Sequence, residues 1–220
     1  MADVSRPFSV QIRGDLACFS RPELKTERVT YPIPTPSSLR GILEAILWKP
    51  AIVWRIDEID LLNPIAYIQF RRNEVNSRVS DHTADSIRKS GEAWTYYADE
   101  DRAQRNTIAL RDVAYTVTAR MELTPRRGPE DSIRKFEEMF ERRLQRGQHV
   151  TQPVLGCREF PAYVEQVERP IRPLDHSEDF GWILHDIRFG IENRPVFFHA
   201  VMNGGVLRVP PFPESGDVAR

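Results

Sequence analysis

The segment TPSSLRGILEAILWKPAIVWRIDEIDLLNPI, which runs from Thr35 to Ile65, decides the fold because it joins an amphipathic helix to a strand. Its first half predicts a helix over Pro36 to Trp48, with Thr35 at the N-cap and Pro36 at the first helical position. Pro50 stops this helix. Four apolar residues recur at the spacing of one helix face and predict its buried side: Leu39, Ile42, Leu43 and Ile46.

Five more segments, including the second half of that stretch, carry the periodicity of strands or of a second helix. Strands are predicted over Phe8 to Arg13, Ala51 to Leu62, Thr107 to Leu123 and Phe160 to Val167, the third with a phase slip that suggests a bulge. A second helix is predicted over Pro129 to Gly147, with Glu130 and Asp131 in its first turn and Gly147 as its C-cap. The order predicts an α+β fold, a ferredoxin-like β-α-β-β-α-β domain over residues 1–168.

The rest of the chain is predicted as an insertion, a small second unit and a tail. Polar residues dominate from Asn73 to Asn106, which predicts a functional or partly disordered insertion. Residues 169–220 are predicted to form a small antiparallel sheet, from strands at Gly181 to Phe189, Val196 to Val201 and Gly205 to Val209. The Gly204-Gly205 pair predicts a hairpin turn, and Pro210 to Arg220 is predicted to be disordered.

Composition restricts the class of protein. The 220 residues are 40% hydrophobic with a formal net charge of −1, so the chain has a globular composition without a bulk basic excess. Cys18 and Cys157 are too few and too far apart for a disulfide scaffold, and no cysteine or histidine cluster suggests a metal. No apolar run has the length of a membrane span, so we expect a soluble, cytoplasmic protein with no membrane partner.

Cations and aromatic residues gather at three places that would suit RNA. Arg40, Trp48 and Lys49 lie along and after the first helix, where Trp48 could stack on a base or close the core. Basic and aromatic residues are interleaved after the first strand, a pattern that supplies phosphate neutralisation and stacking. The candidates there are Arg21, Lys25, Arg28 and Tyr31, and those further along are Arg71, Arg72, Asn73, Arg105, Arg142, Arg143 and Arg158. Three carboxylates, Glu27, Glu74 and Glu159, could instead hold these arginines in surface ion pairs.

Several blocks together resemble the CRISPR-associated proteins of family five, Dvulg subtype, from type I-C systems. The blocks are GDLACFSRPELKTERVTYPIPTPSSLRGILEAILWKP (Gly14 to Pro50), RRNEV, Gln104-Arg105, FERRLQRGQ, LGCREFPA, GWILHDI and FFHAVMNGGV. Their order and spacing extend nearly end to end. The resemblance implies a ferredoxin-like RNA-binding fold, binding of CRISPR repeat RNA and metal-independent cleavage of that RNA, with no cofactor.

The same resemblance implies a catalytic set at three positions of this chain. Family members that process RNA carry an aromatic residue or His before Trp-Lys-Pro and a Lys-His pair opening the second helix, which fall on Leu47, Lys135 and Phe136. Only Lys135 matches. His149 is the preferred substitute base because its ordinary pKa of about 6.5 suits proton transfer. Tyr31 and Tyr115 are weaker candidates, and His185 and His199 are predicted to be packed residues.

Two functions therefore stay open at this point. The first is a precursor-RNA endoribonuclease that cuts at the 3′ base of the repeat stem-loop by 2′-OH attack and retains the 5′ handle. The alternative is a non-catalytic subunit that caps the 5′ handle. Both would partner the backbone and large subunits of the interference complex. Double-stranded DNA binding is a third, side activity, which would be salt-sensitive and independent of sequence.

Overall fold

The computed structural model describes residues 3–24, 26–77, 79–91, 95, 97–189 and 193–213. Within them the chain forms a mixed α/β fold. The elements in chain order are β1 (Phe8–Ala17), β2 (Arg28–Val29), α1 (Pro36–Ile46), β3 (Ile52–Leu61), β4 (Tyr67–Val75), α2 (Asp81–Ser90), β5 (Arg102–Leu123), α3 (Ile133–Gln145), β6 (Tyr163–Gln166), β7 (Glu178–Arg188), β8 (Arg194–Asn203) and β9 (Val206–Arg208). None of the described helices combines the length and apolarity required to cross a bilayer.

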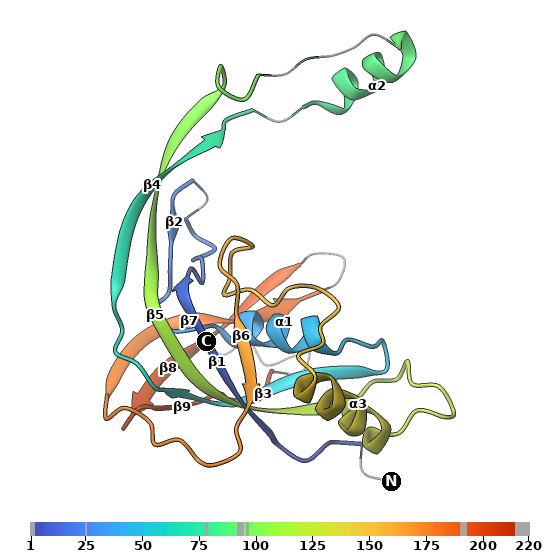
Figure 1. Cartoon of the computed structure of the whole chain (residues 1–220), viewed down its shortest axis with the longest axis vertical. Coiled ribbons are helices and arrows are strands. Elements are labelled where there is room, and N and C mark those ends of the chain that lie inside the picture. The colour runs from blue at the N-terminus through green and yellow to red at the C-terminus, as the bar shows by residue number, and fades with distance from the viewer. Residues whose placement is uncertain are drawn as a thin grey trace.

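A single sheet organises the molecule (Figure 1). Its strand order is β6-β1-β5-β3-β9-β8-β7, while β4 and β2 pair with β5 outside that path. Every pairing is antiparallel except the short one between β2 and β5. The C-terminal strands β7, β8 and β9 form a meander, and β9 pairs with β3. Residues after position 169 therefore extend the sheet that the N-terminal strands begin.

Helix α1 has the cap and the buried face that its sequence predicts. The Thr35 hydroxyl accepts a hydrogen bond from the Ser38 amide at 3.2 Å, which satisfies one of the free amides of the first turn. The apolar stripe from Leu39 to Ile46 is buried. The helix ends at Ile46, earlier than predicted, because Leu47 is already extended with φ −141° and ψ 107°.

Helix α3 is shorter than predicted. It begins at Ile133, after the Ser132 cap, whose hydroxyl accepts a hydrogen bond from the Lys135 amide. The prediction that Glu130 and Asp131 occupy the first turn is wrong, since both precede the cap. Gly147 has a φ of +61° and follows the actual C-cap, Arg146, by one residue. A left-handed residue just past the cap is where glycine is favoured.

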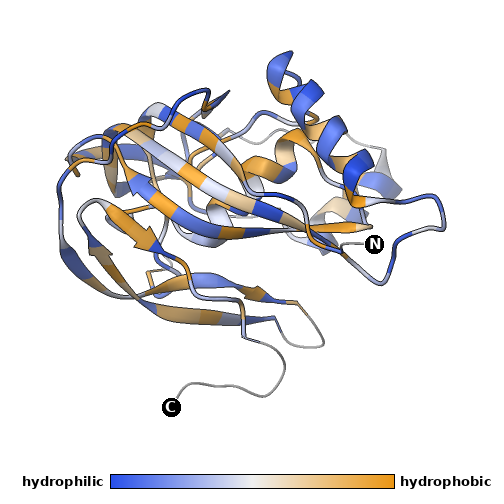
Figure 2. Cartoon of the chain, turned by 90° about the horizontal axis from the view of Figure 1, so that it is seen from below, coloured by the Kyte–Doolittle hydropathy of each residue, from blue (hydrophilic) through white to orange (hydrophobic). Residues whose placement is uncertain are grey.

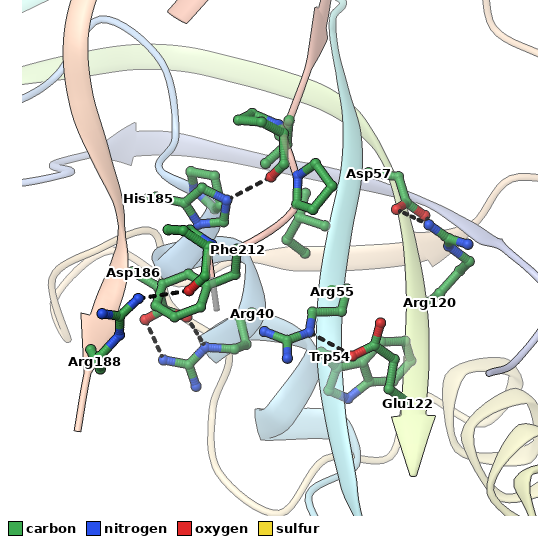
Figure 3. A pocket seen from close by; sticks show the side chains of 16 residues that line it. Arg40, Trp54, Arg55, Asp57, Arg120, Glu122, His185, Asp186, Arg188 and Phe212 are labelled. Carbon is green, nitrogen blue, oxygen red and sulfur yellow. Dashed lines mark hydrogen bonds and ion pairs between the residues drawn. The ribbon is translucent and has the colours of Figure 1, made fainter. Parts of the chain in front are cut away.

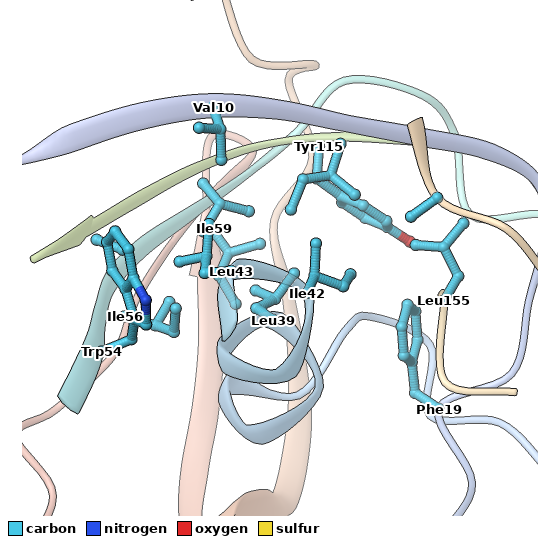
Figure 4. Close-up of a cluster of buried hydrophobic side chains, with 14 of the residues drawn as sticks. Val10, Phe19, Leu39, Ile42, Leu43, Trp54, Ile56, Ile59, Tyr115 and Leu155 are labelled. Atoms are coloured by element: carbon cyan, nitrogen blue, oxygen red, sulfur yellow. The ribbon is translucent and has the colours of Figure 1, made fainter. Parts of the chain in front are cut away.

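The hydrophobic core fills the space between α1 and the sheet (Figure 4), and the buried residues of α3 add to it. Trp54 of β3 is fully buried there, and its ring packs edge-on against Phe140 of α3 at 4.7 Å and against Phe8 of β1 at 6.2 Å. The Trp54 indole nitrogen donates to the Leu47 carbonyl at 3.0 Å. This bond gives the buried indole N–H its partner and fixes the turn that follows α1. Figure 2 shows the alternation of hydrophobic and hydrophilic residues along the strands.

Strand β5 is 22 residues long and changes partners along its length. Its first part pairs with β4, and its second part lies between β1 and β3. The predicted phase slip coincides with Asp112, which has a φ of +51° between these two parts. The β4–β5 ribbon projects from the body as an arm, with α2 at its far end (Figure 1). The described part of the predicted polar insertion therefore contains regular structure, namely the end of β4, the helix α2 and the start of β5.

The three predicted C-terminal strands are present, and Gly204 and Gly205 form the turn between β8 and β9, both with positive φ. The predicted disorder from Pro210 onward is wrong for the described part. The Pro210 carbonyl accepts a hydrogen bond from His185 at 2.8 Å, and the Pro213 carbonyl accepts one from Arg188 at 2.6 Å. Residues 214–220 lie outside the described residues.

Candidate nucleic-acid interface

The turn after α1 exposes one aromatic residue and buries its neighbour. Leu47 is fully buried, whereas Trp48 is 56% exposed and Lys49 is exposed. The alternative that Trp48 closes the core is wrong, because Trp54 occupies that place. An exposed indole beside an ammonium group offers a stacking surface and a phosphate partner together. This turn thus presents an aromatic surface and a cation side by side.

The start of α3 brings a second ammonium group close to this turn. The Lys135 ammonium lies 3.1 Å from Asp131, whose other carboxylate oxygen accepts the Gly128 amide at 3.0 Å. The Gly128 hydrogen bond, and then the Lys135 ammonium, hold the pKa of Asp131 below its ordinary value, and Lys49 adds to this effect. Lys49 and Lys135 therefore flank one carboxylate at the N-terminal end of α3, where the helix dipole also favours an anion.

The other two positions of the implied catalytic set belong to the core. Leu47 is 0% exposed and Phe136 is 2% exposed, and both lie in the main hydrophobic cluster. The Lys135 ammonium lies 5.8 Å from the centre of the Phe136 ring. Neither hydrocarbon side chain can donate or accept a proton, so Lys135 is the one proton-carrying group among the three positions.

His149 lies at the opposite end of α3 from Lys135. It follows the C-terminus of the helix, exposed, beside a hollow of about 270 Å³ that Arg143 and Tyr163 also line. Lys135 and Gln145 are ten positions apart in α3, a rise of roughly 15 Å. Lys135 and His149 therefore lie at opposite ends of the helix. Arg143 itself donates to the Ile46 carbonyl at 2.6 Å, which caps α1, while Arg142 is exposed.

Three of the predicted RNA-binding arginines meet at the base of the arm, in what we call the arm-base cluster: Arg28, Arg72, Arg105, Glu74 and Glu159. Arg28 pairs with Glu74 at 3.1 Å and with Glu159 at 3.4 Å, and Arg72 pairs with the same carboxylates at 3.0 Å and 2.9 Å. Arg105 lies 3.7 Å from Glu74. The ion-pair alternative thus holds for Glu74 and Glu159, although three guanidinium groups face only two carboxylates.

The neighbouring candidates on β4 and on the loop before β6 point elsewhere. Arg71 and Asn73 alternate with Arg72 and Glu74 along β4, so they lie on its other face, and both are exposed. Arg158 is exposed as well. These three side chains are available to a ligand without breaking an ion pair of the cluster.

Two predicted contact residues serve the fold. Tyr31 is 1% exposed and is covered by the Arg21 guanidinium, 4.8 Å from the ring centre, so its prediction as a stacking platform is wrong. Burial raises the pKa of Tyr31, which also argues against a role as a base. Arg40 pairs bidentately with Asp186 of β7 at 2.7 and 2.9 Å, and it ties α1 to the sheet. Lys25 lies outside the described residues.

The remaining aromatic and histidine candidates are also placed. Tyr115 is fully buried, and burial raises its pKa above the ordinary range, so it cannot serve as a base. His185 is packed, as predicted, with 7% exposure. His199 is not packed: its side chain is 48% exposed and lies 3.1 Å from Asp179. The prediction for His199 is therefore wrong.

Residues 9–210 match the model of the Cas5d family, described as CRISPR-associated protein (Cas_Cas5). This chain belongs to the Cas5d family. Two relatives carry the name CRISPR pre-crRNA endoribonuclease Cas5d. The one from Mannheimia succiniciproducens is 44% identical over 212 residues, which cover 92% of this chain and 94% of the relative. The one from Thermus thermophilus is 38% identical over 223 residues, which cover 92% and 91%.

The Cas5d fold is also seen in solved structures. One crystal structure of a CRISPR-associated protein superposes with a TM-score of 0.69 and covers 94% of this chain and 93% of its own, at 21% identity. At that identity the likeness establishes the fold alone. It supports the mixed α/β architecture with a large antiparallel sheet. In this architecture Trp48 and Lys49 lie in the turn after α1, and Lys135 lies in the first turn of α3.

Sequence reasoning missed a groove on this Cas5d chain that β3, β5, β7 and the C-terminal segment enclose (Figure 3). Its volume is about 700 Å³. Arg55 pairs with Glu122 at 2.8 Å and Arg120 pairs bidentately with Asp57, both across β3 and β5. Phe212 occupies the groove between Arg55 and Arg188. No local motif marks these residues, because strands and tail that are distant in sequence bring them together.

Proposed function

We propose that this protein is the endoribonuclease that processes precursor CRISPR RNA in a type I-C system, acting in the cytoplasm. The observation that carries the proposal is the 44% identity, over 92% of the chain, to a relative named as a pre-crRNA endoribonuclease. In the proposed reaction the 2′-OH of the RNA attacks the adjacent phosphate at the 3′ base of the repeat stem-loop. The protein then retains the 5′ handle.

The proposed site is the N-terminal end of α3 with the turn after α1. Lys135 would stabilise the oxyanion that forms on the attacked phosphate, and Lys49 would neutralise the charge of that phosphate before the reaction. Trp48 would stack on the base next to the scissile bond. His149 would contact RNA at the far end of α3, since the helix separates it from Lys135.

The proposed site carries no side chain that could act as a strong base at the Leu47 and Phe136 positions. Alignment of the 2′-OH with the phosphate and stabilisation of the oxyanion are the contributions that remain. We therefore propose that the proton leaves to solvent. The rate should then rise with pH across the neutral range, instead of following the bell shape that a paired acid and base produce.

We further infer that residues 1–168 form a ferredoxin-like core. The order β6-β1-β5-β3, all antiparallel, with α1 between β1 and β3 and α3 between β5 and β6, supports this inference. The division from a second unit at residues 169–220 stays a prediction. The two proposed units are in direct contact, since β9 pairs with β3 and the Leu174 amide donates to the Leu61 carbonyl at 2.7 Å.

The proposed partners are the repeat RNA and the backbone and large subunits of an interference complex. An exposed apolar face on the β7–β8 hairpin supports protein partners: Trp182 is 60% exposed, Val201 40% and Phe197 38%. Exposed apolar residues that gather on one face are typical of interaction sites. Double-stranded DNA is proposed only as a side ligand.

A second function, a non-catalytic cap on the 5′ handle, is favoured by the burial of Leu47 and Phe136. One experiment separates the two. The pure protein is incubated with its cognate repeat RNA in excess EDTA, beside a substrate with a 2′-deoxy nucleotide at the scissile position. Cleavage of the first RNA alone supports the endoribonuclease, whereas tight binding of both RNAs without a cut supports the cap.

A further inference from the structure

The two cysteines of the chain lie against each other, although 138 residues separate them in sequence. Cys18 follows β1, and Cys157 lies in the loop between α3 and β6. The Cys157 thiol lies 3.8 Å from the Cys18 carbonyl oxygen, and each thiol shifts the pKa of the other. Both are free thiols. The fold thus creates a dithiol that sequence spacing argues against.

The backbone around the pair is tightly fixed. The Cys18 amide donates to the Leu155 carbonyl at 3.0 Å, and the Phe160 amide donates to the Cys157 carbonyl at 3.0 Å. Gly156 has a φ of +85°, and a Cβ atom there would lie 2.0 Å from the Cys18 carbonyl oxygen. Only glycine permits this approach. The loop is therefore held against the end of β1 with its thiol facing Cys18.

The surroundings give the two sulfur atoms different chemistry. The Arg28 guanidinium lies 3.5 Å from the Cys157 sulfur, and Ser20 lies 3.6 Å from the Cys18 sulfur. The hydrogen bond from the Cys18 thiol, followed by the one from Arg28, lowers the pKa of Cys157. The same interaction, together with burial, raises the pKa of Cys18. A thiolate beside a guanidinium is the form that reacts with oxidants.

We propose that Cys18 and Cys157 form a reversible disulfide in response to a hydroperoxide, so that the protein carries a redox-sensitive site separate from its RNA chemistry. The Cys157 thiolate attacks one peroxide oxygen, which breaks the O–O bond and gives a sulfenic acid and hydroxide. The Cys18 sulfur then attacks the Cys157 sulfur and displaces the second oxygen, which takes up the Cys18 proton and leaves as water. The hydroxide of the first step is neutralised by the proton that Cys157 released when it ionised. In total two thiols and one hydrogen peroxide give one disulfide and two waters.

The dithiol adjoins the arm-base cluster, because Arg28 belongs to both. Arg28 contacts the Cys157 sulfur and also pairs with Glu74 and Glu159. A disulfide carries no charge, so oxidation removes the anionic partner of Arg28 and leaves its guanidinium to the cluster. Oxidation also links the loop before β6 covalently to the end of β1. The state of the dithiol is thereby coupled to the base of the arm.

The experiment uses the full-length protein, reduced, freed of reductant and exposed to hydrogen peroxide at neutral pH. Thiols are counted after denaturation, and the intact mass is measured. We expect both thiols to disappear, the mass to fall by two hydrogen atoms, the protein to stay monomeric on a non-reducing gel, and dithiothreitol to restore both thiols. Two surviving thiols, added oxygen atoms or cross-linked dimers would each overturn the proposal.

Two variants assign the roles within the pair. Cys18→Ser should leave Cys157 to accumulate oxygen adducts instead of a disulfide, because no second sulfur resolves the sulfenic acid. Arg28→Ala should slow disulfide formation about ten-fold, because the thiolate loses its cation. Arg158→Ala is the matched control, since Arg158 is exposed beside Cys157 and should leave the rate unchanged. Equal rates for the wild type and Arg28→Ala would contradict the assigned role of Arg28.

Discussion

At the scale of single residues, exposure separates the positions that could act on RNA from those that cannot. Lys135 is about half exposed and bound to one carboxylate, whereas Leu47 and Phe136 are sealed in the core. An exposed ion pair of this kind contributes little to stability. Lys135 can therefore leave Asp131 for a phosphate at small cost, which places the proposed chemistry on this one side chain.

Lys135→Ala is expected to slow cleavage of the repeat RNA about 100-fold while the protein remains folded, because one donor to the oxyanion is lost. Single-turnover cleavage rates and thermal melting test this. Arg134→Ala is the matched control, since Arg134 is 85% exposed and pairs with Glu138 one turn away. Equal losses in the two variants would show that general charge, not position, matters.

Asp60 of β3 is expected to lower stability at neutral pH. One of its carboxylate oxygens is buried and has no hydrogen-bond partner among the described residues, and burial, followed by the charge of Glu58, raises the pKa of Asp60 to about 6. The unfolded pKa is about 3.9. The folded protein thus binds this proton more tightly than the unfolded chain does, so stability falls as pH rises from about 4 to about 6.

Asp60→Asn should accordingly raise the free energy of unfolding at pH 7 by about 1 to 3 kcal/mol, with little change at pH 4. The cross-strand Thr116 hydroxyl, also buried without a partner, gives the new amide a neighbour. Urea denaturation at both pH values measures the effect. A gain that is the same at pH 4 and pH 7 would contradict the assigned ionisation.

At the scale of elements, β4 presents two different arginine faces. Arg72 is 16% exposed and bonds Thr107, Glu74 and Glu159, whereas Arg71 is exposed on the other face. The same residue type in adjacent positions therefore has two roles. Strand alternation predicts the division, but only the pairing with β5 and the loop before β6 decides which face is internal.

Arg72→Ala should lower the free energy of unfolding by about 1–2 kcal/mol, because Thr107 and Glu159 lose a hydrogen-bond donor and the partly buried Glu74 loses an ion-pair partner. Arg71→Ala should leave stability unchanged and weaken RNA binding, with a smaller dependence on salt. Melting temperatures and RNA titrations at several salt concentrations separate these effects. The roles would be reversed if Arg71→Ala destabilised the protein and Arg72→Ala did not.

At the scale of the whole molecule, charge is balanced overall but unevenly distributed. The net charge is −1, and about half of the described arginines are paired with carboxylates, among them Arg28, Arg40 and Arg120. Non-specific attraction to polyanions is therefore weak, and RNA recognition falls to exposed cations outside these ion pairs, such as Arg71 and Arg158. This arrangement favours a shaped single-stranded ligand over a uniform duplex.

Binding to double-stranded DNA should therefore be weak, independent of sequence and steeply salt-dependent, with the logarithm of the affinity falling linearly against the logarithm of salt concentration. Competition between the repeat stem-loop and random duplex DNA, repeated at low and physiological salt, measures this. Duplex binding that persists at physiological salt would mean that a dedicated DNA surface exists.

Local patterns in the sequence were enough to predict the main periodic elements, the N-cap of α1 and the family. The Thr35 cap, the α1 stripe, the central strands and the hairpin at Gly204-Gly205 depend on neighbours within a few residues, and such local patterns are readable. The burial, exposure and proximity of individual side chains depend on long-range contacts, and they became known only from the tertiary structure. It buried Tyr31, exposed Trp48, separated Lys135 from His149 by the length of α3, and joined Cys18 to Cys157. Burial and proximity between distant segments follow from how the strands pair and how the helices pack on the sheet, and no short stretch of sequence contains that information.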